Sequence, residues 1–88
     1  MAAKKPSQPW KVVFFTAAAP LPEKKFRSQA AMHRAINGER DLIREGSSRV
    51  VRATAFQWDA AAGRWMTFER YPLKAEVDAE VDAEAGSE

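Results

Sequence analysis

The sequence contains no cysteine, one histidine and only four glycines in 88 residues. Without cysteine the protein has no disulfides, no thiolate zinc sites and no thiol nucleophiles, so packing and hydrogen bonds must hold the fold together. The glycines stand far apart in the sequence, which argues against a glycine-rich loop that cradles phosphates. The lack of cysteine also fits a reducing cytoplasm, which is the location that we expect.

Long apolar runs are absent as well. No stretch approaches the roughly 20 apolar residues that a membrane-spanning helix requires, so we expect no membrane-embedded segment and no membrane partner. A chain of 88 residues suits a single domain. A domain of this size buries only about 60 to 65% of the surface that its unfolded chain exposes, so each large apolar residue must contribute to one core.

Catalytic groups are scarce. His33 is the single imidazole, and no carboxylate stands at a spacing typical of a triad or a metal site, so we expect a surface histidine. A carboxylate enzyme would need two converging acids, but Asp59 falls in a predicted turn and Glu69 on a predicted strand. The sequence therefore predicts a protein that is not an enzyme, with no catalytic residues, no metal, no cofactor and no evident small-molecule substrate.

The formal net charge of +2 is the average of two very different regions. Residues 1–74 contain all 14 lysines and arginines and six acids, which is a net charge of +8. Residues 75–88 contain six acids and no base, which is a net charge of −6. An asymmetry of this kind favours an electrostatic partner, and nucleic acid is the first candidate.

The acidic region repeats a four-residue Ala-Glu-Val-Asp unit, with Val77 and Val81 as its only large apolar groups. Burial of two valines cannot offset the entropy lost on ordering the segment, and repulsion between the acids opposes a helix. We therefore predict a disordered acidic tail at 75–88. The segment 1–9, with lysines and prolines, is predicted to be a disordered N-terminal arm, which leaves a single ordered domain at 10–74.

Three β-prone runs are predicted to form strands. The first covers residues 10–16, which are mostly β-branched or aromatic, and two prolines soon afterwards begin a loop. The second and third, residues 48–58 and 64–71, form a hairpin, because Asp59 favours the start of a turn and Gly63 supplies the positive φ that closes it. A proline directly after the third run ends the hairpin.

A helix is predicted from about Glu23, because four apolar residues then recur at helical spacing. They are Met32, Ala35, Ile36 and Ile43. Glu39 interrupts this stripe and Asn37-Gly38 is a turn dipeptide, which favours a kink or break there, followed by a second short helix. Alternatively, an arginine at the helix edge holds Glu39. Gly46 is expected to end the helix as a left-handed cap, with Arg44 near the negative end of the helix dipole.

The predicted order of the elements is β-α-β-β. It indicates a small α+β domain whose three-stranded, mostly antiparallel sheet is covered on one face by the helix. The core is expected to unite all of these elements. Its predicted members are Phe14 or Phe15, Ile36, Ile43, Val51, and one of Trp65 or Phe68.

Alternation along residues 48–58 divides their side chains between two faces. The small Ala53 and Ala55 would let a helix approach closely, so we place them, with Val51, under the helix. The other face then carries Arg52, Thr54, Phe56 and Trp58. A slip of one residue in the hairpin reverses the third strand, so two companion sets remain open. They are Arg64, Met66, Phe68 and Arg70, or Trp65, Thr67, Glu69 and Tyr71.

An open sheet face with aromatic rings between arginines is typical of proteins that bind single-stranded nucleic acid, because bases stack on the rings and guanidinium groups contact phosphates. The predicted binding residues are Arg52, Phe56, Trp58, Arg64 and Arg70. A simpler interpretation is that the aromatics form the core of a small domain and the arginines fold over them. The loss of solubility that exposed aromatic residues cause favours this simpler interpretation.

Two functional hypotheses follow. The first is a small non-enzymatic nucleic-acid-binding accessory or regulatory protein, whose acidic tail competes for the basic hairpin face. The second is a protein-interaction module, a small regulator or inhibitor that binds another protein through the Trp- and Arg-rich hairpin or through a sheet edge. The alanine- and arginine-rich composition is similar to that of proteins from GC-rich bacterial genomes or their phages.

Overall fold

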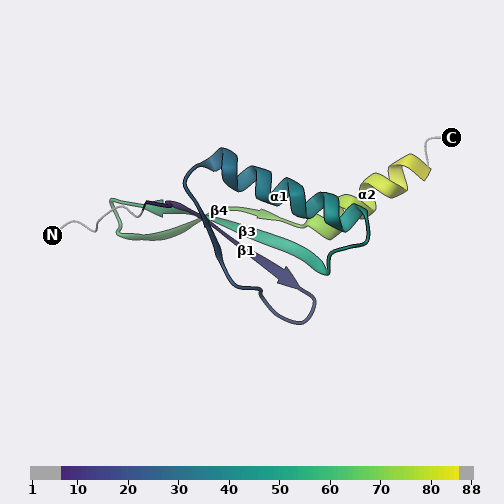
Figure 1. Ribbon diagram of the computed structural model, residues 1–88, viewed down its shortest axis with the longest axis horizontal. Coiled ribbons are helices and arrows are strands. Elements are labelled where there is room, and N and C mark those ends of the chain that lie inside the picture. The colour runs from purple at the N-terminus through teal and green to yellow at the C-terminus, as the bar shows by residue number, and fades with distance from the viewer. Residues whose placement is uncertain (1–6, 86–88) are drawn as a thin grey trace.

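The computed structural model describes residues 7–85, which form four strands and two helices. In chain order these are β1 (Trp10–Thr16), β2 (Lys24–Phe26), α1 (Gln29–Arg44), β3 (Val50–Asp59), β4 (Arg64–Tyr71) and α2 (Leu73–Ala85). The strands form one sheet in the order β2-β1-β3-β4, and every neighbouring pair is antiparallel. Both helices pack on one face of this sheet (Figure 1). The predicted α+β class is confirmed, but the fourth strand and the second helix are additions to the predicted fold.

β2 is a strand at the place where the sequence predicts the first turn of the helix. It pairs with the start of β1, so that Phe26 lies opposite Trp10 and packs against the core. The predicted helix start near Glu23 is therefore wrong. A run of three residues is too short to display the alternation by which strands are recognised in a sequence. The helix start is marked instead by Ser28, whose side-chain oxygen accepts a hydrogen bond from the backbone N–H of Ala31.

α1 continues through Asn37-Gly38 without a break, so the predicted kink is wrong. Gly38 faces open space, with nothing within 4 Å of the place where a Cβ would stand. Glu39 accepts a hydrogen bond from the hydroxyl of Ser48, so its partner is this serine and not the arginine of the alternative prediction. Three buried apolar residues on the helix outweigh the roughly 1 kcal/mol that a mid-helix glycine costs.

Both predicted glycine turns are confirmed. Gly46 follows the end of α1 in the left-handed region, with φ of 76°, and the N–H of Ser47 bonds back to the carbonyl of Leu42. Gly63 closes the β3–β4 hairpin with φ of 65°. Asp59 opens the same turn, because its side-chain oxygen accepts hydrogen bonds from two backbone N–H groups of the loop.

The acidic segment forms α2, which corrects the prediction of a disordered tail for most of its length. Leu73 is fully buried, and Val77, one helical turn later, is 4% exposed. Two ion pairs tie this helix to α1, one of them between Arg44 and Glu80 at 2.8 Å. The sequence of the acidic repeat does not indicate this burial or these ion pairs. The first buried residue precedes the repeat, and the arginines that offset repulsion among the acids belong to α1.

The two ends of the chain are described only in part. Residues 1–6 and 86–88, where disorder is also predicted, lie outside the described residues. In the described part of the predicted N-terminal arm, Pro9 contacts β3, because its carbonyl accepts a hydrogen bond from the N–H of Trp58 at 2.8 Å.

The core lies between the sheet and the two helices. Its buried members are Val12, Phe14, Met32, Ile36, Ile43, Val50, Ala53, Ala55, Leu73 and Val77. Among the residues that the sequence assigns to the core, Phe14, Ile36 and Ile43 are therefore confirmed.

Three other predicted core residues, Val51, Trp65 and Phe68, lie outside this buried cluster and are corrections. β3 has a bulge opposite the end of β1, so Val50 instead of its neighbour turns toward the helices. Leu73 and Val77 of α2 belong to the buried cluster, whereas Trp65 and Phe68 of the hairpin do not.

Candidate functional site

We call the face of the sheet opposite the helices the open face. Strand alternation and the pairing registers determine which side chains lie on it. They are Lys11, Val13 and Phe15 of β1, Lys25 of β2, Arg52, Thr54, Phe56 and Trp58 of β3, and Trp65, Thr67 and Arg70 of β4. The predicted division of β3 is confirmed for Ala53 and Ala55, which are buried on the helix side.

β4 presents residues from both of the predicted companion sets. Trp65 and Thr67 lie opposite open-face residues of β3 before a bulge, and Arg70 does so after it. The extra residue is Phe68, which turns to the other face and packs edge-on against Trp10, with ring centroids 5.0 Å apart. Because a bulge shifts the alternation by one residue, no single register describes the whole strand.

Four of the five predicted binding residues come together on the open face. They are Arg52, Phe56, Trp58 and Arg70. Arg64 does not join them, because it pairs with Asp59 at the end of the hairpin and lies on the opposite face. Lys11, Phe15 and Trp65 are additions to the predicted set. Alternation along β1 indicates that Lys11 and Phe15 lie on one face of that strand. Only the strand order shows that β1 is the neighbour of β3.

Three aromatic rings and one lysine form a group that we call the distal cluster, near the hairpin end of the open face. Its members are Phe56, Trp58, Trp65 and Lys11. The two indoles meet edge to face, with centroids 5.5 Å apart and planes at 76°. The Lys11 ammonium stands 4.9 Å from the centroid of Phe56 and 4.6 Å from that of Trp65, and Glu23 holds it there at 3.1 Å. All three rings are partly exposed, so they offer surface to a ligand.

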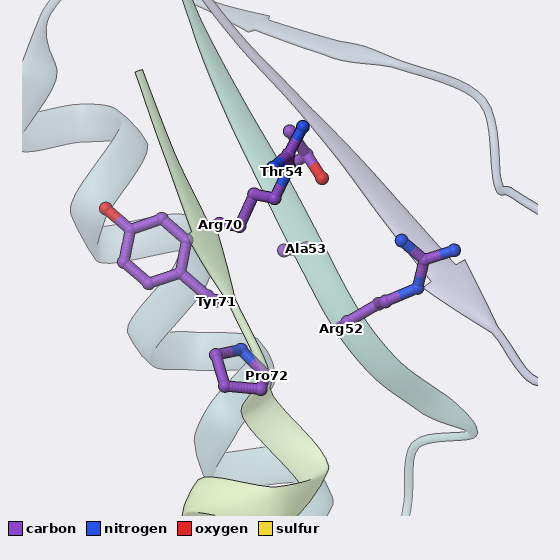
Figure 2. A pocket seen from close by; sticks show the side chains of 6 residues that line it. All are labelled: Arg52, Ala53, Thr54, Arg70, Tyr71 and Pro72. Atoms are coloured by element: carbon purple, nitrogen blue, oxygen red, sulfur yellow. The ribbon is translucent and has the colours of Figure 1, made fainter. Parts of the chain in front are cut away.

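A second feature, which we call the proximal hollow, lies beside the end of β4 (Figure 2). Its volume is about 240 Å³, and it is lined by Arg52, Ala53, Thr54, Arg70, Tyr71 and Pro72. The hollow lies where β4 ends at Tyr71 and the chain turns through Pro72 into α2, while β3 extends further. In Figure 2 Arg70 extends over Thr54, whereas Arg52 extends toward β1. There the Arg52 guanidinium carbon lies 4.1 Å from the centroid of the Phe15 ring.

Three acids of the tail form ion pairs away from the open face. Among the side chains of residues 7–83, two of these pairs join α2 to α1 and one lies within α2. The hydrogen bond from Arg44 lowers the pKa of Glu80, which favours the charged carboxylate in this pair. Neither Arg52 nor Arg70 forms an ion pair within the same range. Among the side chains of residues 7–83, the acids of the tail therefore do not pair with the arginines of the open face.

A polar contact on the helix side connects α1 to the end of β4. The Tyr71 hydroxyl is 3.4 Å from Nε2 of His33, which is only partly exposed and so differs from the predicted surface position. Burial, followed by the neighbouring Glu69, raises the pKa of Tyr71, so the phenol stays neutral. This contact joins a helix to the sheet and lies away from the open face.

Residues 7–85 contain no cluster of three or more histidine or carboxylate side chains that could hold a metal ion. In the same part of the chain, no helix is both long enough and apolar enough to cross a membrane. The open face, with the distal cluster and the proximal hollow, is therefore the candidate site that geometry identifies. No protein-family model, no curated protein and no solved structure matches the chain.

Proposed function

We propose that this protein binds single-stranded nucleic acid on the open face. One observation carries the proposal. Partly exposed aromatic rings and two arginines lie on the same sheet face, which the helices leave uncovered, and neither arginine forms an ion pair with a side chain that the structure describes. Unpaired bases stack on flat rings, at roughly 1 to 3 kcal/mol for each base, and arginines bind the phosphates between them. The distal cluster supplies the rings and the proximal hollow supplies the arginines.

The simpler interpretation, that the aromatics form the core, has less support. The buried cluster is built from the helix side, and none of Phe56, Trp58 and Trp65 belongs to it. Lys11 and Arg52 lie over rings of the open face, as cations do when they shield aromatic surface from water. A base can displace Lys11, because it stacks on the same ring faces of Phe56 and Trp65.

The proposed role is that of a small non-enzymatic accessory protein, with α2 as a structural element. Its acids bind arginines of α1, and its first turn completes the core. Competition between the acidic segment and the ligand is therefore not part of the proposal. The basic charge of the open face stays available to phosphates.

Fluorescence anisotropy with a labelled oligothymidine of about 16 nucleotides tests the proposal, since sites on small domains span about 4 to 16 nucleotides. We expect binding that weakens steeply as salt rises from about 50 to 200 mM. Arg70→Gln should lower both the affinity and the slope of affinity against salt, because a phosphate contact releases counterions. Trp58→Ala should lower the affinity and keep the slope, because stacking releases none.

Arg64→Gln is the matched control, because it removes the same charge from the same strand but from the opposite face. Its affinity should stay within about twofold of that of the parent at the upper salt concentration, where distant charges are screened. Thermal unfolding followed by circular dichroism shows that each variant is folded. If the folded parent shows no salt-dependent binding at about 50 mM, the proposal is wrong.

A second candidate function, binding of another protein, is supported by β4. This eight-residue strand forms one edge of the sheet, and Met66 and Phe68 on it are 40% and 38% exposed. An edge strand with exposed apolar residues can pair with an extended segment of a partner. This function predicts a complex that salt barely weakens and that is sensitive to Phe68→Ser but not to Arg70→Gln.

A further inference from the structure

We propose that the proximal hollow is a phosphate site, in which one phosphate group binds between the guanidinium groups of Arg52 and Arg70. The inference rests on the proposed function and specifies which part of the ligand binds at which end of the open face. Its starting point is that both arginines line the same hollow and that neither forms an ion pair with the described side chains, those of residues 7–83.

The spacing of the two arginines suits a single phosphate. Arg70 lies directly opposite Thr54, which is two residues along β3 from Arg52. Cross-strand diagonal neighbours of this kind are roughly 7 to 8 Å apart. Each guanidinium presents its N–H donors in a planar fork that matches two phosphate oxygens. Two such forks on adjacent strands can therefore hold one phosphate from two sides.

Arg52 is held in place by the protein itself. Its guanidinium carbon lies 4.1 Å from the centroid of Phe15, so the group rests over that ring. A guanidinium that stacks on a ring uses its flat face, whereas hydrogen bonds to phosphate use its edge. The two interactions do not compete, and a side chain that is already held loses less entropy when it binds.

The charges around the hollow favour an anion, while most of the surface that faces it is apolar. Apart from the two arginines its residues are uncharged, and no carboxylate is among them. The acids of α2 that pair with α1 lie on the helix side, behind the sheet. On the open face a phosphate would therefore meet the positive charge of two arginines, because the neighbouring Glu69 lies on the helix side of the sheet, in a space of about 240 Å³.

The site also orients the nucleic-acid strand. Arg52 and Trp58 lie on the same face of β3 at a separation of about 20 Å, given a rise of roughly 3.3 Å per residue. The bound phosphate then lies at one end of the open face and the stacked bases at the other. The ligand strand consequently runs along β3 and does not cross the sheet.

Heteronuclear NMR of the full chain tests the site with three probes at matched ionic strength. They are inorganic phosphate, a thymidine dinucleotide that carries only its internal phosphodiester, and the same dinucleotide with an added 5′-phosphate. We expect the side-chain N–H signals of Arg52 and Arg70 to shift first. Arg52→Gln and Arg70→Gln should each weaken binding of the tightest probe about tenfold, whereas Arg64→Gln should leave it unchanged.

The probes also distinguish two sources of the phosphate. Equal binding of the two dinucleotides supports a site for the internal phosphodiester, and preferential binding of the phosphorylated one supports a site for a terminal phosphate. If Arg64→Gln weakens binding as much as Arg70→Gln does, the attraction is general and the phosphate site is overturned. The same holds if none of the three probes shifts the two arginine signals.

Failure of the phosphate site and failure of the proposed function give different results. Binding of a long oligothymidine that depends on Trp58 but not on Arg52 or Arg70 would overturn the phosphate site and leave the proposed function intact. Binding of inorganic phosphate at the two arginines, in a protein that ignores long oligonucleotides, would support the site and overturn the proposed function.

Discussion

At the scale of single residues, Val77 and Val81 show how position decides the role of identical side chains in a repeat. They occupy consecutive copies of the same four-residue unit, yet Val77 is 4% exposed and Val81 is 58% exposed. Four residues apart on a helix, both belong to one face. That face meets the core only in the first turns of α2, because the helix then extends past the end of the sheet (Figure 1).

We expect Val77→Ala to lower the free energy of unfolding by about 1 to 3 kcal/mol, because it removes buried methyl groups and leaves a cavity. Val81→Ala is the matched control on the exposed part of the same helix, and its effect should stay within about 0.5 kcal/mol. Urea unfolding followed by circular dichroism measures both. Equal losses for the two valines would contradict the docking of α2.

At the scale of elements, the contact between α1 and α2 combines burial with ion pairs, and the ion pairs make it depend on pH. The hydrogen bond from Arg44 lowers the pKa of Glu80 in the folded protein. A carboxyl group of this kind stabilises the folded state at pH values above its unfolded pKa, and the contribution is lost as the pH falls through its lowered folded pKa. We therefore expect the exposed part of α2 to loosen from α1 below the ordinary titration range of glutamate.

The carboxyl carbon signal of Glu80, followed by NMR across acidic pH, measures this effect. Its midpoint in the parent should lie below the midpoint in Arg44→Gln, where the hydrogen bond is absent. Identical midpoints in the two proteins would show that the Arg44–Glu80 pair does not form in solution.

At the scale of the whole molecule, opposite charges lie at different places on an elongated body. The molecule measures 60 × 26 × 17 Å, and α2 and the hairpin turn stand at opposite ends of its long axis (Figure 1). Charges separated by more than about 10 Å are largely screened at 0.1 M salt. The acidic segment therefore influences the distal cluster only weakly and through the overall field.

A variant with Asp78→Asn and Asp82→Asn tests this separation, because both residues are exposed on α2. At about 150 mM salt its affinity for oligothymidine should differ from that of the parent by less than about twofold. At low salt a modest gain should appear, since the field is then less screened. A large gain that persists at the higher salt concentration would indicate an acidic segment that competes for the open face after all.

The sequence by itself determined the features that depend on residues a few positions apart. The hairpin turn follows from Asp59 and the positive φ of Gly63, and the end of α1 follows from Gly46, because these are local backbone conformations. The helical stripe of α1 and the two faces of β3 follow from the periods of helix and strand. Most of the predicted binding face, including Phe56 and Trp58, could be predicted from these periods.

Only the tertiary structure decided the features that depend on contacts between distant parts of the chain. β2 is a strand because β1 is available to pair with it, and α2 is a helix because it meets the core and the arginines of α1. The bulge at Phe68 turns Arg70 to the open face while Arg64 remains on the other. Lys11 and Trp65 come from the two strands that flank β3. The contacts of Lys11 with Trp65 and with Phe56 therefore follow from strand order and register, which local periodicity does not encode.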